Sequence, residues 1–161
     1  MADGAVIKVA GLKELRSALR KASDTFPSEI KEINFAVVND ILVPEAQHEA
    51  AAVTLTTWKG KSFHVNQQVI ASIRALSQQR AAIIAMGGAK VPYAAGDEFG
   101  SMGGKSRKGK GHTTQFGGWK GNTTDAGYFL WPSIRAKSPE IQAKYLQLLD
   151  RMLAGPFPDK G

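Results

Sequence analysis

The glycines and lysines between residues 100 and 121 are the residues whose types and spacing most invite a chemical role. A phosphate-binding loop needs a glycine, four further residues and then Gly-Lys-Ser or Gly-Lys-Thr, so that backbone N–H groups surround a phosphate and the hydroxyl meets Mg²⁺. Gly104-Lys105-Ser106 would require a glycine where Phe99 stands, and Lys110 is followed by Gly111 instead of a hydroxyl residue. Neither segment is expected to follow a buried strand and open a helix, so the sequence argues against a nucleotide site.

The remaining candidate chemical groups are too scattered to predict a reaction. His48, His64 and His112 are separated by 16 and 48 residues, which is not the spacing of metal ligands on one helix or turn. Asp97 and Glu98 are adjacent, so on a strand they would point to opposite faces, and we expect them to serve in salt bridging or turn capping. The chain has no cysteine and no nucleophile-elbow sequence. We therefore expect no catalytic residue, no metal site and no cofactor, and a protein that is not an enzyme.

The formal charge of +7 is concentrated in one segment. Five cations and no acid lie between Gly100 and Gly121: Lys105, Arg107, Lys108, Lys110 and Lys120. Neighbouring like charges add their potentials, so this loop would attract a polyanion or an acidic protein surface. A solvated loop whose lysines only keep the protein soluble is the alternative.

Aromatic side chains follow or interrupt the same cationic segment. Those that we single out as interface aromatics are Phe116, Trp119 and Trp131. Tryptophan and tyrosine are enriched at the centres of protein interfaces, which favours burial in the core or at a subunit contact. Stacking on single-stranded bases is the alternative, because aromatics interleaved with lysine and arginine can hold unpaired nucleotides.

Two helices are expected before this region. Apolar residues recur every three or four positions from Gly11 to Ser23, and again from Pro27 to about Leu42. Pro44 lacks a backbone donor and should kink or end the second helix, although the alanine-rich stretch from Glu45 to Val53 could resume it. The pattern therefore predicts a long helix that is broken near Pro44.

The middle of the chain favours short strands and one long loop. Residues 54–64 are compatible with a hairpin or a loop, and residues 69–76 with a short helix or an irregular strand. Ala81–Met86 is a compact apolar run ended by two glycines, which indicates a buried strand, and Val91–Ala95 would return antiparallel to it. Residues 100–127 hold nine of the 17 glycines and cannot build a core, so we interpret them as a long extension that orders on assembly.

A last strand and a final helix complete the expected fold. The apolar stretch Tyr128–Trp131 predicts a strand. Ser138, Pro139 and Glu140 have the order of a helix cap, a first-turn proline and an N-terminal acid, so a helix should begin there. Its apolar stripe is formed by Ile141, Tyr145, Leu148, Leu149 and Met152. The expected class is α+β, with N-terminal helices, an antiparallel sheet with a long Gly/Lys-rich loop, and a C-terminal helix.

Length and composition indicate one domain over residues 1–161, with an extended loop at 100–127. Of the apolar residues 22 are alanine, so the core is lean and burial against partners could add to its stability. No apolar run approaches the length of a membrane span, and the N-terminus lacks the pattern of a secretion signal. We therefore expect a soluble protein with no membrane contact.

Three segments in the second half of the chain carry a resemblance to a known family. They read VPYAAGDEFGS at 91–101, QFGGWKGN at 115–122 and AGYFLWPSIRAKSPEI at 126–141, after an opening IKVAGLKELRSALRKAS at 7–23. Together they resemble the tail-completion or head-tail joining proteins of long-tailed bacteriophages, particularly actinobacterial siphophages. The resemblance spans most of the chain in the right order, and its motifs are packing and turn signatures, not catalytic ones.

The resemblance implies an α+β fold and a homo-oligomeric, six-fold ring in the virion neck, assembled in the host cytoplasm. This ring would lie between the connector or adaptor ring of the capsid and the tail terminator or tail tube, with double-stranded DNA passing through its lumen. We expect the four loop cations at 105, 107, 108 and 110 to contact an acidic surface of the next ring or subunit, with lumenal DNA as the second choice. The alternatives are a tail terminator that caps the tail tube, and a stand-alone DNA-binding module.

Overall fold

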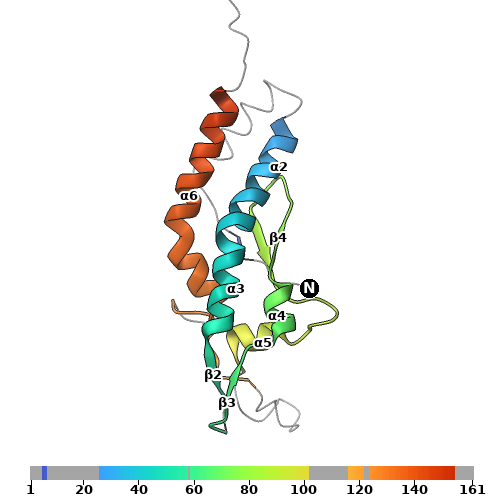
Figure 1. Cartoon of the computed structure of the whole chain (residues 1–161), viewed down its shortest axis with the longest axis vertical. Helices are drawn as coiled ribbons and strands as arrows, with labels where there is room; N and C mark the ends of the chain where they lie inside the picture. Colours follow the sequence, from blue (N-terminus) through green and yellow to red (C-terminus); the bar gives the residue numbers. More distant parts are fainter. Residues whose placement is uncertain (1–4, 7–25, 58, 102–115, 122–123, 155–161) are drawn as a thin grey trace, which may run out of the picture.

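The computed structural model describes residues 5–6, 26–57, 59–101, 116–121 and 124–154 (Figure 1). In chain order its elements are β1 (Ala5–Val6), α2 (Phe26–Val37), η1 (Val38–Leu42), α3 (Val43–Ala52), β2 (Thr54–Thr56), β3 (Ser62–His64), α4 (Gln67–Ser72), β4 (Arg74–Leu76), β5 (Ile83–Ala85), α5 (Ala94–Phe99) and α6 (Leu130–Ala154). The combination of helices with two small antiparallel sheets confirms the expected α+β class. The helix predicted over Gly11–Ser23 lies outside the described residues.

One long helical rod consists of α2, η1 and α3 without an intervening loop (Figure 1). η1 is a π-helical stretch, in which the N–H of Val43 donates to the carbonyl of Val38, five residues earlier. Pro44 lies in the first turn of α3. Since a proline has no N–H and its ring clashes with the carbonyl four residues earlier, the wider turn just before Pro44 lets the rod continue. The break predicted near Pro44 is thus a π-helical interruption, after which the helix resumes.

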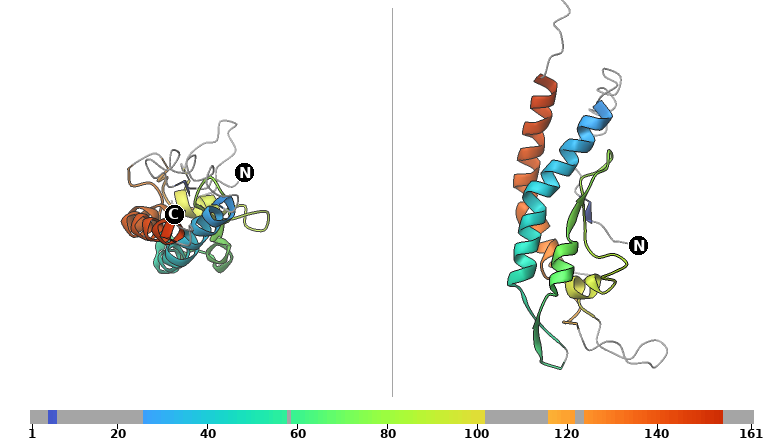
Figure 2. Two further views of the ribbon diagram at one scale, coloured as in Figure 1. Left: turned by 90° about the horizontal axis from the view of Figure 1, so that it is seen from above. Right: turned by 45° about the vertical axis from the view of Figure 1, so that its right-hand side comes forward.

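α6 lies alongside the rod and runs in the opposite direction (Figures 1 and 2). Ile141, Tyr145 and Leu149 recur every four residues along it and are all buried. Leu148 and Met152 are partly buried and pack against the same core. The apolar stripe predicted for the C-terminal helix is therefore confirmed.

The predicted start of this helix is wrong. Tyr128–Trp131 does not form a strand, because α6 already begins at Leu130. Ser138 and Pro139 do not cap the helix, since both lie in its interior. The first turn of α6 is capped instead by Glu98, a residue distant in sequence, as described below.

Two small antiparallel sheets form the rest of the described fold. In the three-stranded sheet β5 lies between β1 and β4, with Ile84 opposite Ala75 on β4. The sheet packs against η1 on one side of the rod (Figure 2). The two-stranded sheet is a hairpin of β2 and β3, with Leu55 opposite Phe63, and it projects beyond the end of α3 (Figure 1).

These sheets decide the ambiguous parts of the sequence. Residues 54–64 form a hairpin, and residues 69–76 contain both a short helix, the end of α4, and a strand, β4. The strand predicted within Ala81–Met86 is confirmed as β5. The return strand predicted over Val91–Ala95 is wrong, because Val91 forms only an isolated bridge with Gly88 and α5 begins directly afterwards.

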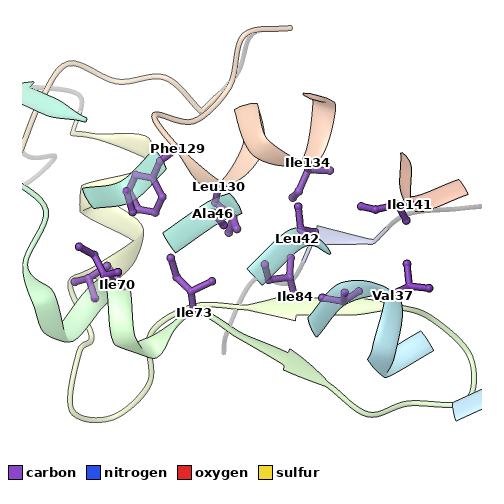
Figure 3. Packing of buried hydrophobic residues seen from close by; sticks show 14 of the residues in the cluster. Val37, Leu42, Ala46, Ile70, Ile73, Ile84, Phe129, Leu130, Ile134 and Ile141 are labelled. Carbon is purple, nitrogen blue, oxygen red and sulfur yellow. The ribbon is translucent and has the colours of Figure 1, made fainter. Parts of the chain in front are cut away.

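The described apolar side chains form one core cluster between the rod, α6 and the three-stranded sheet (Figure 3). Leu42 of η1 lies between Ile134 of α6 and Ile84 of β5, and its side chain is 1% exposed (Figure 3). Ala46 and Ala50 of α3 are fully buried, and their small side chains let α4 and α6 approach this part of the rod closely.

A buried amide attaches the β4–β5 connection to the rod. The Asn34 side chain is 2% exposed, and its Nδ2 donates to the carbonyl oxygens of Gln78 at 2.8 Å and Gln79 at 3.3 Å. A polar side chain of this kind is tolerated in a core only when such partners satisfy it. The hydrogen bonds therefore fix the position of this connection along α2.

Truncation of the central leucine should destabilise the protein strongly. Leu42→Ala removes a buried side chain that the rod, α6 and β5 enclose, and we expect the free energy of unfolding to fall by about 2–5 kcal/mol. Leu146→Ala is the matched control, because Leu146 lies on a helix of the same fold and is 53% exposed. Urea denaturation of both variants measures the difference. Equal losses for the two leucines would contradict this placement of the core.

Candidate functional site

Three segments far apart in the sequence meet near the end of the molecule from which the β2–β3 hairpin projects (Figure 1). We call residues 98–101, 116–121 and 127–131 the loop base, because the first two of these segments flank residues 102–115. The N–H of Lys120 donates to the carbonyl of Phe99 at 2.8 Å, and the N–H of Ser101 donates to the carbonyl of Gly117 at 2.9 Å. The two ends of the cationic segment are therefore paired with each other by backbone hydrogen bonds.

The third segment joins both of the others. The N–H of Tyr128 donates to the Glu98 carbonyl, and the N–H of Gly127 donates to the Lys120 carbonyl, each at 2.9 Å. The Tyr128 hydroxyl donates to the carbonyl of Gly118 at 2.7 Å. The residues just before α6 thus contact both ends of the cationic segment.

The Glu98 carboxylate is the centre of the loop base. Its Oε2 accepts from the N–H groups of Phe129 at 3.1 Å and Leu130 at 2.9 Å, and its Oε1 accepts from the N–H of Trp131 at 2.9 Å. These N–H groups belong to the first turn of α6 and the residue before it, where a helix leaves its donors without partners of its own. A negative charge here also meets the positive end of the helix dipole. Glu98 therefore acts as the cap of a helix that begins about thirty residues later.

Burial raises the pKa of Glu98 above its ordinary value, although the hydrogen bonds from the backbone N–H groups of residues 128–131 oppose that rise. The side chain is 0% exposed, so its charged form depends on those donors instead of on water. Asp97 is also buried, and loss of hydration raises the pKa of its carboxyl to about 6. Of the two adjacent acids, Glu98 caps the start of α6 instead of a turn, and neither forms a salt bridge among the described residues.

Two glycines allow the backbones of the loop base to approach so closely. Gly100 has a φ of 73°, and a Cβ at this position would overlap the carbonyl of Gly118. Gly127 has a φ of 81°, and a Cβ there would overlap the Glu98 carboxylate and lie 2.7 Å from Cβ of Trp131. Both positions combine a left-handed backbone with no room for a side chain, so glycine is required.

Some of the described aromatic side chains of the loop base are exposed and others are partly or fully buried. Trp119 is 42% exposed and lies with its ring centroid 6.4 Å from that of Phe99, at an angle of 48°. Nζ of Lys120 lies 4.5 Å from the centroid of the Tyr128 ring, which is a cation–π contact. These contacts hold the indole of Trp119 near Phe99 and the cation of Lys120 over Tyr128, and both side chains stay exposed.

The three interface aromatics predicted from the sequence differ in their exposure. Trp119 and Trp131 are the exposed pair, at 42% and 36%. Phe116 is half-buried and packs on Gly96, where a Cβ would come within 2.6 Å of its ring. Burial in the core therefore does not describe the two tryptophans, and whether partners cover them stays a prediction.

Of the five predicted cations, Lys120 is the one that the described residues include, and its side chain is exposed. The other four lie outside the described residues: Lys105, Arg107, Lys108 and Lys110. Both of their flanks belong to the loop base.

Comparisons with known protein families, with curated proteins and with solved structures found no match to this chain. Over the part of the chain that the structure describes, no helix is both long and apolar enough to span a membrane. Within the same residues, no three histidine or acidic side chains are grouped to hold a metal ion. The expectations about catalysis, cofactors and partners stay predictions.

The role of Glu98 as the helix cap is the feature of this site that sequence reasoning did not assign. On a strand these adjacent acids would point to opposite faces. They lie instead in α5, a short helix whose last turn is enclosed by the loop base, and both are buried. One sequence signal could have indicated this role. The two acids lie in an apolar, glycine-rich stretch with no nearby cation, and acids that are buried in such a stretch need backbone N–H donors.

Removal of the Glu98 carboxylate should destabilise the fold by more than its size suggests. Glu98→Ala leaves three backbone N–H groups at the start of α6 without their acceptor, and we expect the free energy of unfolding to fall by about 2–4 kcal/mol. Glu98→Gln keeps one acceptor oxygen and should lose less. Glu32→Ala, an exposed acid on α2, is the control and should change stability by less than about 0.5 kcal/mol. Urea denaturation at pH 7 measures all three, and equal losses at Glu98 and Glu32 would contradict the capping role.

Asp97 should make stability depend on pH between about 4 and 6. Its pKa of about 6 in the folded protein exceeds the ordinary 3.8, so the folded state binds more protons than the unfolded state in this range. Its contribution to stability is therefore present below about pH 4 and is lost as the pH rises through 6. Asp97→Asn removes this titration, so the stability of the variant relative to wild type should rise by about 2–3 kcal/mol from pH 4 to pH 7. Urea denaturation across this range measures both proteins, and parallel pH profiles would refute the assignment.

Proposed function

We propose that the chain is a structural protein of the bacteriophage neck, which forms a ring that joins the capsid connector to the tail and surrounds the path of the DNA. The observation that carries this proposal is the loop base. Parts of three of the four segments that carry the resemblance meet there, at 98–101, 116–121 and 127–131. Motifs defined by packing and turns are thus accounted for by one structural unit, whose two flanks lead into the cationic segment.

A joint of this kind requires a cationic contact segment with firmly held ends. Ser101 and Phe116 border residues 102–115, and the hydrogen bonds of the loop base fix the backbone next to both. When the two ends of a segment are already held together, less entropy remains to be lost on docking. We therefore assign the four cations of that segment to an acidic surface of the next ring or subunit, and the lumenal DNA is their second possible contact.

Assembly into a ring would multiply this charge. Six copies with five loop cations each would carry about 30 formal positive charges around one ring, and neighbouring potentials add. The lean, alanine-rich core fits such a protein, because binding to neighbours stabilises the folded state by mass action. The partners in this proposal are other copies of the chain, the connector or adaptor ring, and the tail terminator or tail tube.

A nucleic-acid-binding module is the second candidate, because Trp119 and Lys120 are both exposed and adjacent. Aromatic and cationic side chains in this arrangement can stack on and pair with a single strand. This candidate differs from the neck protein in what one subunit does alone. A module would bind nucleic acid tightly as a monomer, with strong salt dependence, whereas the neck protein would assemble with neck partners.

Reversal of the four loop cations tests the proposed function. Changing Lys105, Arg107, Lys108 and Lys110 to Glu should reduce the joining of heads to tails by at least about tenfold, since the segment would repel an acidic partner surface. The measurement is the yield of complete virions when the variant replaces the wild-type protein. A control reverses the cations Lys31, Lys144 and Arg151 of the helices and should preserve the yield. Unchanged virion yield with all four loop cations reversed would count against the proposal.

A further inference from the structure

Charge is unevenly divided between the helical rod and the rest of the fold. Residues 26–52, which form α2, η1 and α3, contain five acids and one cation, Lys31. The acids are Glu29, Glu32, Asp40, Glu45 and Glu49. Glu45 lies 3.6 Å from Nζ of Lys137 on α6, so its charge is partly matched within the molecule. The others give the rod a surplus of negative charge.

Part of this surplus is exposed on the same stretch of the rod as an exposed aromatic ring. Glu32 and Asp40 are exposed, and Phe35 lies between them along the rod at 38% exposure. We call Glu32, Phe35 and Asp40 the carboxylate stretch. An exposed apolar ring with charged side chains near it along the rod, the exposed Lys31 among them, has the composition of an interface patch.

The region between Val53 and Gly121 has the opposite character. Its sequence contains only two acids, Asp97 and Glu98, and both are buried. Its described cations are all exposed: Lys59, Lys61, Arg74, Arg80, Lys90 and Lys120. Within this region the described positive charge has no exposed acid to balance it, and the next exposed acid along the chain is Asp125.

Three of these exposed cations lie at the end of the molecule that carries the β2–β3 hairpin. Lys59 and Lys61 lie in the turn of the hairpin, and Lys120 lies in the loop base. The loop base contacts the hairpin, because a Cβ on Gly117 would lie 3.5 Å from the carbonyl oxygen of Thr56. We call Lys59, Lys61 and Lys120 the cationic end. Figure 1 shows the β2–β3 hairpin at the opposite end of the long axis from α2, which carries Glu32 and Phe35, so one molecule does not bring the hairpin onto its own α2.

We propose that a second copy of this chain docks its cationic end on the carboxylate stretch. The hairpin cations of the cationic end and Glu32 of the carboxylate stretch lie far apart on one molecule. They can therefore pair with each other only when the cationic end of one copy contacts the carboxylate stretch of another. Contact of two cationic ends about a twofold axis would place like charges together, whereas a head-to-tail contact pairs opposite charges. Head-to-tail contacts generate rings when the rotation closes. The inference rests on the proposed function and names the surfaces that would build its ring.

Charge reversal and its rescue test this contact in the full-length protein. One variant carries Lys59→Glu and Lys61→Glu, a second carries Glu32→Lys and Asp40→Lys, and a third combines all four changes. Sedimentation velocity at about 50 mM salt measures the dissociation constant of self-association for each. An exposed ion pair changes such a constant by roughly 1.5- to 5-fold, and reversal converts attraction into repulsion. We expect each double variant to associate about tenfold or more weakly, and the fourfold variant to return to within about threefold of wild type.

A matched control and a second ligand make the result decisive. Lys144→Glu with Arg151→Glu on α6 changes the net charge as much as the hairpin variant does, and it should leave association within about twofold of wild type. Binding of a DNA duplex of about 30 base pairs is measured in parallel by fluorescence anisotropy. Self-association that both double variants retain would overturn the inference. It would also be overturned if the hairpin variant lost only duplex binding and kept its self-association. A wild-type protein that stays monomeric at about 100 µM would also overturn it.

Failure of this contact and failure of the proposed function give different results. If wild-type rings form and the reversals do not weaken them, the docking surfaces are wrong and virion joining by the loop cations is unaffected. If the reversals act and rescue each other but heads and tails join normally without the loop cations, the contact is right and the neck function is wrong. Circular dichroism and melting temperature confirm that each variant is folded, which the exposure of all four changed residues favours.

Discussion

A buried negative charge that must be satisfied by backbone N–H groups is the constraint on which the rest of this fold depends. The Glu98 carboxylate is held by the first donors of α6, and in return those donors receive the acceptor that a helix start requires. Because α5 provides the acid and α6 provides the donors, neither helix can move without the other. The two glycines at 100 and 127 then let the connecting backbones close around the pair. Helix packing and the shape of the loop base are thus set by one interaction.

The sequence predicted those elements whose signals are local and missed those decided at a distance. Periodic apolar residues identified α2 and the stripe on α6, because burial of one helix face depends on spacing alone. The start of α6 was misplaced because Ser138, Pro139 and Glu140 form a good local cap, whereas the actual cap comes from α5. An internal proline costs roughly 3 kcal/mol. The buried residues Ile134 and Ile141 on either side of Pro139 tie that stretch to one core, which offsets the cost.

The candidate site divides in the same way. The concentration of lysines and the absence of a phosphate-binding loop follow from residue types and spacing, whereas the exposure of Trp119 and Trp131 does not. The convergence of the three segments does not follow from them, because nothing in the residue types at 91–101 indicates that this segment will contact residues at 115–122 and 126–141. The separation of charge between the rod and the hairpin end was also hidden in the sequence. A net charge adds all residues together, whereas the effect on a partner depends on which acids are buried, and here Asp97 and Glu98 are.

The π-helical stretch η1 changes the angular phase of the rod. More residues per turn in one short stretch mean that α3 faces a different direction from the one an uninterrupted α-helix would give it. Val38 and Leu42, the first and last residues of η1, are both buried, because a turn of more than about 3.6 residues keeps positions four apart on one side of the rod. One rod can therefore serve the three-stranded sheet along one part of its length and the short helix α4 along another. The wider turn of η1 thus lets two differently oriented sides of one continuous helix each contact a different neighbour.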